Sequence, residues 1–148
     1  MRILISGGSR GIGRACVEYF TKNGDTVAFI YRSNHTAARS VSESFGATAI
    51  CADISSSCEA NRAVDEAVAS LGGIDVLINN AGISQIKLFT DITDEDWDTM
   101  ISSNLSSAFY LTRAALPFMI SQKSGRIINI GSMWGKVGAS CEVHYSAS

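Results

Sequence analysis

A glycine-rich turn near the amino terminus is the segment whose composition most directly suggests chemistry. Three of its glycines, Gly7, Gly11 and Gly13, follow an apolar run at residues 2–6 and lead into the first stretch of helical period. At such a junction the chain turns tightly and aims the free N–H groups of a helix terminus at a pyrophosphate, and glycine permits both the turn and the close approach. A turn that only connects a strand to a helix is the alternative. The candidate phosphate-binding residues are Gly7, Ser9, Arg10, Gly11, Ile12 and Gly13.

The elements that must position this turn follow a βαβ pattern, because short apolar runs bounded by turn residues alternate with helical stretches. Most of these runs lack apolar and polar alternation, so helices should cover both faces of the sheet. Right-handed crossovers then predict an α/β fold, a Rossmann-like, doubly wound parallel sheet with strand order 3-2-1-4-5 in a three-layer α/β/α arrangement. Five strands are expected, at residues 2–6, 26–31, 47–52, 74–79 and 126–130.

Apolar stripes with helical spacing fall between these strands, at residues 12–20 and 60–71. Ser56 and Thr93 are each followed three residues later by an acidic residue, so each is expected to form a capping box. The helix that begins after Thr93 is long and is expected to kink near Pro117, the only proline.

The overall composition narrows the possible functions. The chain has 148 residues, 46% of them hydrophobic, and no linker-like segment, which predicts one globular domain over residues 1–148. A net charge of -2 provides no basic field for nucleic acid. The four cysteines lack the spacing of a zinc site or a disulfide framework, and no metal is expected. No apolar run approaches the roughly 20 residues of a membrane span, so neither a membrane partner nor secretion is expected, and the predicted location is cytoplasmic.

Further residues in register along the whole chain resemble the classical short-chain dehydrogenase/reductase family. The glycine spacing is that of the family's turn, and the other landmarks follow in the family's order. The resemblance implies an NAD(P)-binding domain and an oxidoreductase. These landmarks are Asp53, Asn79 to Gly82, Asn104, Ser132 and Tyr145.

The resemblance also identifies the cofactor-binding residues. An acidic residue normally ends the second strand in NAD-binding members, but here Tyr31 stands there and Arg32 follows it. A guanidinium can hold a 2′-phosphate by two charge-assisted hydrogen bonds, with Arg10 approaching from the other side, so NADP(H) is preferred and NAD(H) remains possible. The alternative is that Arg32 is only a solvated surface charge.

Two further segments match the family's contacts to the cofactor. Asp53 and Ile54 match the pair that contacts the adenine ring, although an aspartate that caps the next helix would have the same sequence. The small residues of Asn80, Ala81 and Gly82 match the stretch beside the ribose.

The catalytic roles are likewise implied by the family. Reduction of a ketone needs a proton donor and a hydrogen bond to the carbonyl oxygen. In the family the residue matching Tyr145 donates the proton, and the one matching Ser132 holds the oxygen. Asn104 matches a residue that bends the helix and seats a water in the proton relay. Considered alone, each residue also fits an ordinary structural role: Tyr145 as a packed tyrosine, Ser132 as a turn serine and Asn104 as a buried amide.

The family pattern Tyr-x-x-x-Lys is incomplete, because the chain ends at Ser148. The family's lysine binds the ribose and lowers the pKa of the phenol. We therefore expect this chain to be an N-terminal fragment of a longer reductase, ending after the fifth strand and lacking full activity. A noncatalytic nucleotide-binding or interaction module is the alternative.

The substrate and partners rest on finer resemblance. The sequence as a whole is most similar to 3-oxoacyl-carrier-protein reductases, which implies that the substrate is a 3-oxoacyl thioester or a related ketone. Residues 133–143 resemble instead a branch that reduces a 5-aminopentanone group on elongation factor P, where Glu142 would meet an ammonium or would simply be a solvated charge. His144 is expected in a surface loop. Relatives form dimers or tetramers, so a homodimer or homotetramer is expected.

Overall fold

A five-stranded parallel sheet forms the centre of the protein, and a computed structural model describes it with all of residues 1–148. The strands pair in the order β3-β2-β1-β4-β5, and every pairing is parallel, as the sequence predicts. The last three strands are shorter than expected. The strands are β1 (Arg2–Ser6), β2 (Thr26–Tyr31), β3 (Thr48–Cys51), β4 (Val76–Asn79) and β5 (Arg126–Asn129).

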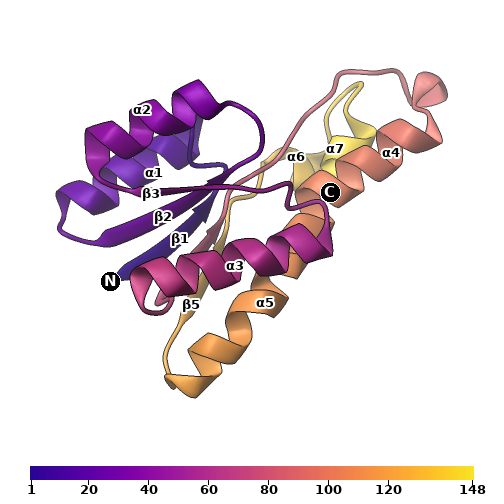
Figure 1. The fold of residues 1–148 in the computed structure, drawn as a ribbon. Helices are drawn as coiled ribbons and strands as arrows, with labels where there is room; N and C mark the ends of the chain where they lie inside the picture. Colours follow the sequence, from indigo (N-terminus) through magenta and orange to yellow (C-terminus); the bar gives the residue numbers. More distant parts are fainter.

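Helices cover both faces of the sheet (Figure 1), which confirms the three-layer architecture. One face packs on α1 (Gly11–Lys22) and α2 (His35–Phe45), and the other packs on α3 (Ser57–Leu71) and α5 (Ser107–Ser121). The sequence did not single out α2. Its buried stripe is short, because only Ala38 and Val41 are buried in its 11 residues.

The two expected capping boxes have different outcomes. Thr93 forms its capping box with Asp96 at the start of α4 (Asp94–Ile101), which confirms the expectation there. The expectation for Ser56 is wrong, because its side chain makes no cap hydrogen bond at the start of α3. Glu59, which would complete that box, is instead held by the guanidinium of Arg62 at 2.8 Å.

The long helix deviates at a different place from the one expected. α5 continues without interruption through Pro117. The irregularity lies at Ser102–Ser106, where a π-helical turn joins α4 to α5. Such a turn inserts an extra residue into the helix and often marks a functional site. This turn contains Asn104. The irregularity therefore lies at the residue that the family resemblance predicts to bend the helix, and not at Pro117.

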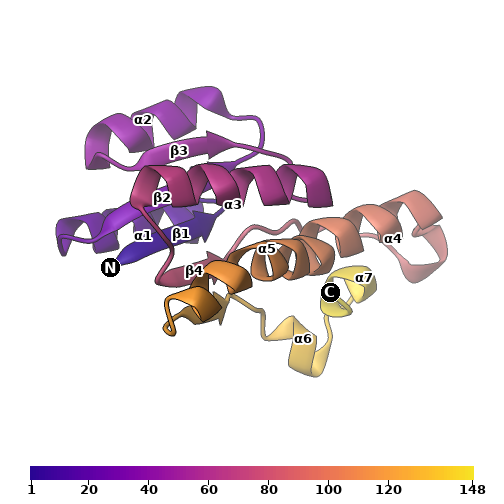
Figure 2. The same cartoon turned by 60° about the horizontal axis from the view of Figure 1, so that its bottom comes forward.

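The remaining elements lie beyond the carboxyl ends of the strands. They are a 3₁₀ turn (Phe89–Asp91), α6 (Trp134–Val137) and α7 (Val143–Ser146). Figure 2 shows α7 beside α4 and α6 next to α7, on the side of the molecule away from the amino terminus. None of the helices is both long and apolar enough to cross a membrane.

Candidate functional site

The larger of two neighbouring cavities, about 500 Å³, lies at the carboxyl ends of β1, β2, β3 and β4. This is where ligands bind in doubly wound sheets, and the volume falls within the range of small-molecule sites. Of the predicted cofactor-binding residues, only Gly13 does not line it. Those that do are Gly7, Ser9, Arg10, Gly11, Ile12, Tyr31, Arg32, Asp53, Ile54, Asn80, Ala81 and Gly82.

The glycine turn is packed too closely for larger residues. Gly7 has a positive φ of 71°, and a Cβ there would lie 3.0 Å from the Cα of Ala81. Gly13 is buried at the start of α1, where a Cβ would overlap the carbonyl oxygen of Gly7. Gly13 therefore shapes the turn from behind by letting α1 approach it, and the cradle fits a group that approaches the backbone closely, such as a diphosphate.

Ser6, at the end of β1, ties this turn to the strand beside it. Its hydroxyl is buried and accepts hydrogen bonds from the backbone N–H groups of Asn80 and Ala81, both at 3.0 Å. The side-chain amide of Asn80 donates to the carbonyl of Ser6 at 2.9 Å. The role of Ser6 could not be predicted from the sequence, because a serine that ends a strand carries no signal of which neighbouring strand it will meet.

Two arginines line the larger cavity, Arg10 from the glycine turn and Arg32 from the end of β2. Arg10 and Arg32 are exposed, and neither guanidinium takes part in any of the seven ion pairs of the structure. The hydroxyl of Tyr31 lies 3.0 Å from Nδ1 of His35, and burial, with Cys51 nearby, raises the pKa of this phenol. Because neither Arg10 nor Arg32 is paired with a carboxylate, both guanidinium groups are free to bind an anion.

Asp53 is the only acidic residue that lines this cavity. Its carboxylate accepts hydrogen bonds from the backbone N–H and the hydroxyl of Ser55, at 3.1 and 2.7 Å. It therefore closes a tight turn before α3 and does not cap that helix. Ile54 is almost completely buried next to it, within the core cluster beneath α3.

The second cavity, about 440 Å³, opens beside the first and contains all three predicted catalytic residues. Asn104, Ser132 and Tyr145 come from the π-turn, from the segment after β5 and from α7. The two cavities share a common wall formed by Ile12 and residues 80–83. Two ligands, or two parts of a reacting complex, can therefore meet there.

Asn104 fastens the π-turn to the loop after β4. Its Oδ1 accepts from the backbone N–H of Ile83 at 2.8 Å, and its Nδ2 donates to the carbonyl of the same residue at 2.9 Å. The same amide nitrogen lies 2.9 Å from the hydroxyl of Ser148, which donates to the carbonyl of Tyr145. Asn104 thus holds the loop on one side and the Tyr145 turn on the other.

The hydroxyl groups of Ser132 and Tyr145 are available to a ligand. Ser132 is exposed, and its Oγ accepts from the backbone N–H of Trp134 at 3.2 Å, so its proton remains free. The half-buried Tyr145 has no hydrogen bond at its phenol oxygen within the chain. Both groups can donate a hydrogen bond to the oxygen of a bound carbonyl compound. No cluster of three metal-ligating side chains forms anywhere.

The expectation that His144 lies in a surface loop is wrong. Its side chain is fully buried, and its Nε2 lies 2.8 Å from Oε1 of Gln85. The local sequence next to Tyr145 gave no sign of this, because burial here depends on α4 and on the loop after β4, which are distant in sequence.

Comparison with known proteins supports the architecture described above. The family model for short chain dehydrogenases matches residues 1–148. The chain belongs to the short-chain dehydrogenase family.

Relatives and a solved structure agree with this membership. The 3-oxoacyl-[acyl-carrier-protein] reductase FabG of Staphylococcus aureus is 35% identical over 150 residues, which cover 98% of this chain and 61% of the relative. The FabG of Escherichia coli K12 is 34% identical over 147 residues, or 98% of this chain and 60% of the relative. A crystal structure of a candidate short-chain alcohol dehydrogenase from Sinorhizobium meliloti superposes with a TM-score of 0.93 at 34% identity, covering 99% of this chain and 60% of that one. The chain thus spans about three fifths of the length of these relatives.

Proposed function

We propose that the full-length protein reduces a ketone to a secondary alcohol with NADPH. The observation that carries the proposal is the shared wall of the two cavities, at Ile12 and residues 80–83, which sets the larger cavity, lined by the predicted cofactor-binding residues, beside the hydroxyl groups of Ser132 and Tyr145. Membership in the short-chain dehydrogenase family and the two reductase relatives point to the same chemistry.

The residues around the larger cavity fit a phosphorylated dinucleotide. The cradle at Gly7 and Gly13 admits a diphosphate, and no carboxylate follows β2 to repel a 2′-phosphate. Arg10 and Arg32 supply two free guanidinium groups for that phosphate. The bound cofactor supplies a hydride to the carbonyl carbon, so the chain itself must bind the ketone and protonate its oxygen.

The second cavity supplies those groups. Tyr145 donates the proton to the developing alkoxide, and Ser132 stabilises the oxygen by a hydrogen bond. Asn104 holds the loop and the Tyr145 turn in place through its bonds to Ile83 and Ser148. In the family pattern Tyr-x-x-x-Lys, the tyrosine is partnered by a lysine four positions later in the chain.

We propose a 3-oxoacyl thioester as the substrate class, because the relatives from Staphylococcus aureus and Escherichia coli are named for that reaction. Apolar side chains after Ser132 suit an acyl chain, since Met133 and Val137 are 65% and 71% exposed. A cationic ketone, such as the aminopentanone group on elongation factor P, is the second candidate. Glu142 favours it, because this half-buried carboxylate takes part in no ion pair.

The test is turnover by the full-length protein with NADPH, using an acetoacetyl thioester and modified elongation factor P in parallel. Oxidation of NADPH that depends on the thioester supports the proposal, and oxidation that depends only on elongation factor P selects the second substrate. If NADPH binds but neither ketone is reduced, the chain is a nucleotide-binding module. If neither NADPH nor NADH binds, the proposed function is wrong.

We propose that this protein forms a homodimer or homotetramer through its long helix, α4 and α5. The outer side of the long helix, from the π-turn through α5, exposes a stripe of large apolar residues with helical spacing, which is unusual for a monomer. The stripe consists of Leu105, Phe109, Leu116 and Ile120, which are 51%, 56%, 38% and 71% exposed.

A further inference from the structure

The buried side chain of His144 lies directly before Tyr145 in α7, and its hydrogen bonding defines its protonation. Gln85 donates through Nε2 to the carboxylate of Asp96 at 2.9 Å, and a carboxylate only accepts, so the amide must turn its Oε1 toward His144. The ring therefore donates from Nε2 over 2.8 Å.

The other ring nitrogen of His144 is buried and has no partner. A proton on Nδ1 would be a charged, buried donor without an acceptor, which is costly. An unprotonated Nδ1, whose lone pair receives no hydrogen bond, costs less in the same position. The ring is therefore neutral, with its proton on Nε2, and it acts only as a donor to Gln85.

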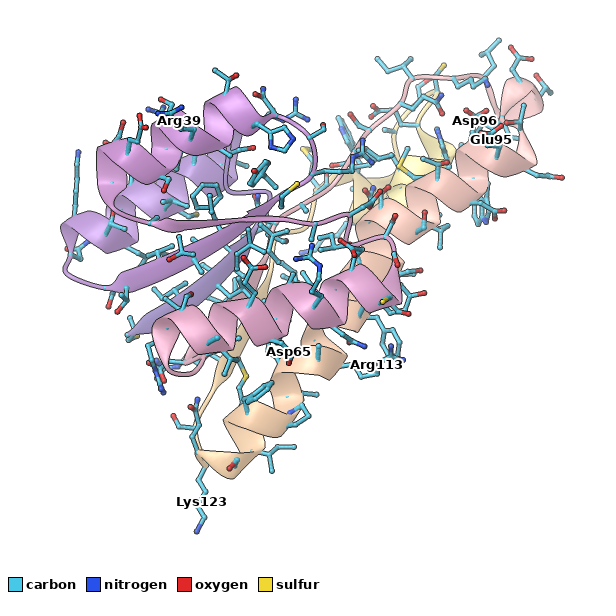
Figure 3. The ribbon with its side chains drawn as sticks, viewed as in Figure 1. Arg39, Asp65, Glu95, Asp96, Arg113 and Lys123 are labelled. Atoms are coloured by element: carbon cyan, nitrogen blue, oxygen red, sulfur yellow. The ribbon has the colours of Figure 1, made fainter.

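The far end of this network is anchored at α4. Asp96 accepts hydrogen bonds from the ammonium of Lys87 and from the backbone N–H of Thr93 in the capping box. Figure 3 shows Asp96 in the part of α4 that projects away from the sheet. The backbone N–H of Lys87 also donates to the carbonyl of Cys141 at 2.7 Å, which ties the same loop to the segment just before α7.

Tyr145 is thus held from both sides. On one side Asn104 binds the hydroxyl of Ser148, which donates to the carbonyl of Tyr145. On the other, His144 binds Gln85, and through it Asp96. α7 has only four residues and cannot fix a side chain by its own backbone bonds.

We propose that His144, as a neutral donor to Gln85, is a positioning residue that sets the place of the Tyr145 phenol. The inference rests on the proposed ketone reduction, in which the phenol must lie within hydrogen-bond reach of the substrate oxygen. A displacement of about 1 Å in such a group can lower the rate about 100-fold. His144 itself touches no substrate, because it is fully buried and lines neither cavity.

The test compares His144→Phe and Gln85→Met in the full-length protein, since each removes one partner of the bond and keeps most of the volume. We expect each variant to lower kcat about 10- to 100-fold, with the Kd of NADPH unchanged, because the cofactor cavity lies elsewhere. The double variant should lose no more than the worse single variant, because both report on one bond. Ile74→Val, which trims a buried residue before β4, is the control for a loss of stability alone, and its kcat should be unchanged.

A second measurement separates this inference from the proposed function. The ring resonances of Tyr145 in tyrosine-labelled protein, without substrate, should shift in both variants and not in Ile74→Val. If the wild-type protein reduces no ketone, the proposed function fails and this shift still decides the positioning role. Should His144→Phe not fold, Gln85→Met carries the test alone. Unchanged Tyr145 resonances, or an unchanged kcat in an active, folded Gln85→Met protein, would overturn the inference.

Discussion

The side chains after β2 determine, in our proposal, which nicotinamide cofactor binds. Arg32 lines the cavity and has no ion-pair partner, so its removal leaves a 2′-phosphate without a charge-assisted bond. Such a bond contributes about 1.5–3 kcal/mol, and we therefore expect Arg32→Ala to raise the Kd of NADPH about 10- to 100-fold. The Kd of NADH should hardly change. Fluorescence titration with both cofactors measures the difference.

Arg39→Ala is the matched control for this experiment. Arg39 lies on α2, pairs with Glu43 at 2.7 Å, and projects from the outer side of the helix in Figure 3. Its removal lowers the positive charge by the same amount without reaching the cavity. An equal weakening of NADPH and NADH in Arg32→Ala would contradict the assigned role.

Tyr145 should contribute to the chemical step and not to cofactor binding. Tyr145→Phe removes the proton donor and keeps the ring, so we expect kcat to fall about 100- to 10,000-fold in the full-length protein. The Kd of NADPH should stay the same, because Tyr145 lines only the second cavity. Steady-state kinetics with a titration of NADPH measures both quantities. A variant that keeps wild-type turnover would show that another group supplies the proton.

At the level of single residues, motif-bearing positions could be predicted and purely spatial ones could not. Ser132 and Tyr145 were recognised by their register with the glycine turn, and the structure brings them to one cavity. His144, by contrast, was expected in a surface loop and is fully buried. Its burial depends on Gln85, which is 59 residues away in the chain.

Among the helices, α4 depends on a single carboxylate for its amino terminus. Hydrogen bonds from Lys87 first, and then from Thr93 and Gln85, hold the pKa of Asp96 well below its usual range. Because the folded-state pKa is lowered, the stabilisation is complete above the unfolded value, about 3.9, and is lost as the pH falls toward the folded value.

Two substitutions test this dependence by urea denaturation. Asp96→Asn should lower the stability at pH 7, and the gap from the wild type should narrow as the pH drops below about 4. Thr93→Ala removes the cap without a charge and should cost about 1 kcal/mol at either pH. Asp98→Asn, a change on the same helix outside the capping box, should show no such gap. A gap for Asp96→Asn that does not vary with pH would contradict the assignment.

The elements that the sequence predicted well are those with an extended apolar pattern. Long stripes such as residues 60–71 identified α3, whereas α2 buries too few side chains to give a clear period. The family resemblance pointed to a bend at Asn104, but the strong intrinsic effect of proline on helices predicted a break in the long helix at Pro117. It lies instead at Asn104, where tertiary hydrogen bonds to Ile83 favour the π-turn.

On the scale of the whole molecule, the strand order followed from the βαβ pattern and the handedness of crossovers, which local sequence and chain connectivity define. The partner that covers the outer side of α4 and α5 cannot be deduced from the sequence in the same way.

We expect Phe109→Glu to shift the full-length protein toward the monomer, since a charge in a buried apolar contact is costly. Light scattering after size-exclusion chromatography measures the mass.

Asp65→Lys serves as the control for the assembly experiment. Asp65 is exposed on α3, which Figure 3 shows next to α5, and its replacement also changes the surface charge. The mass should then remain that of the wild type. An unchanged mass for Phe109→Glu would exclude this stripe as the interface.

The wall that the two cavities share, at Ile12 and residues 80–83, lies between the proposed cofactor site and the proposed ketone site. The specificity for the cofactor can therefore change independently of the specificity for the ketone. In the proposed function, recognition of the 2′-phosphate depends on the end of β2, and handling of the ketone depends on the segment after β5, three strands away in the sheet. A protein engineer could exchange residues 31–34 to obtain a different coenzyme demand while the ketone pocket keeps its selectivity. By the same reasoning, evolution can change the substrate of such an enzyme without changing which reduced coenzyme it consumes.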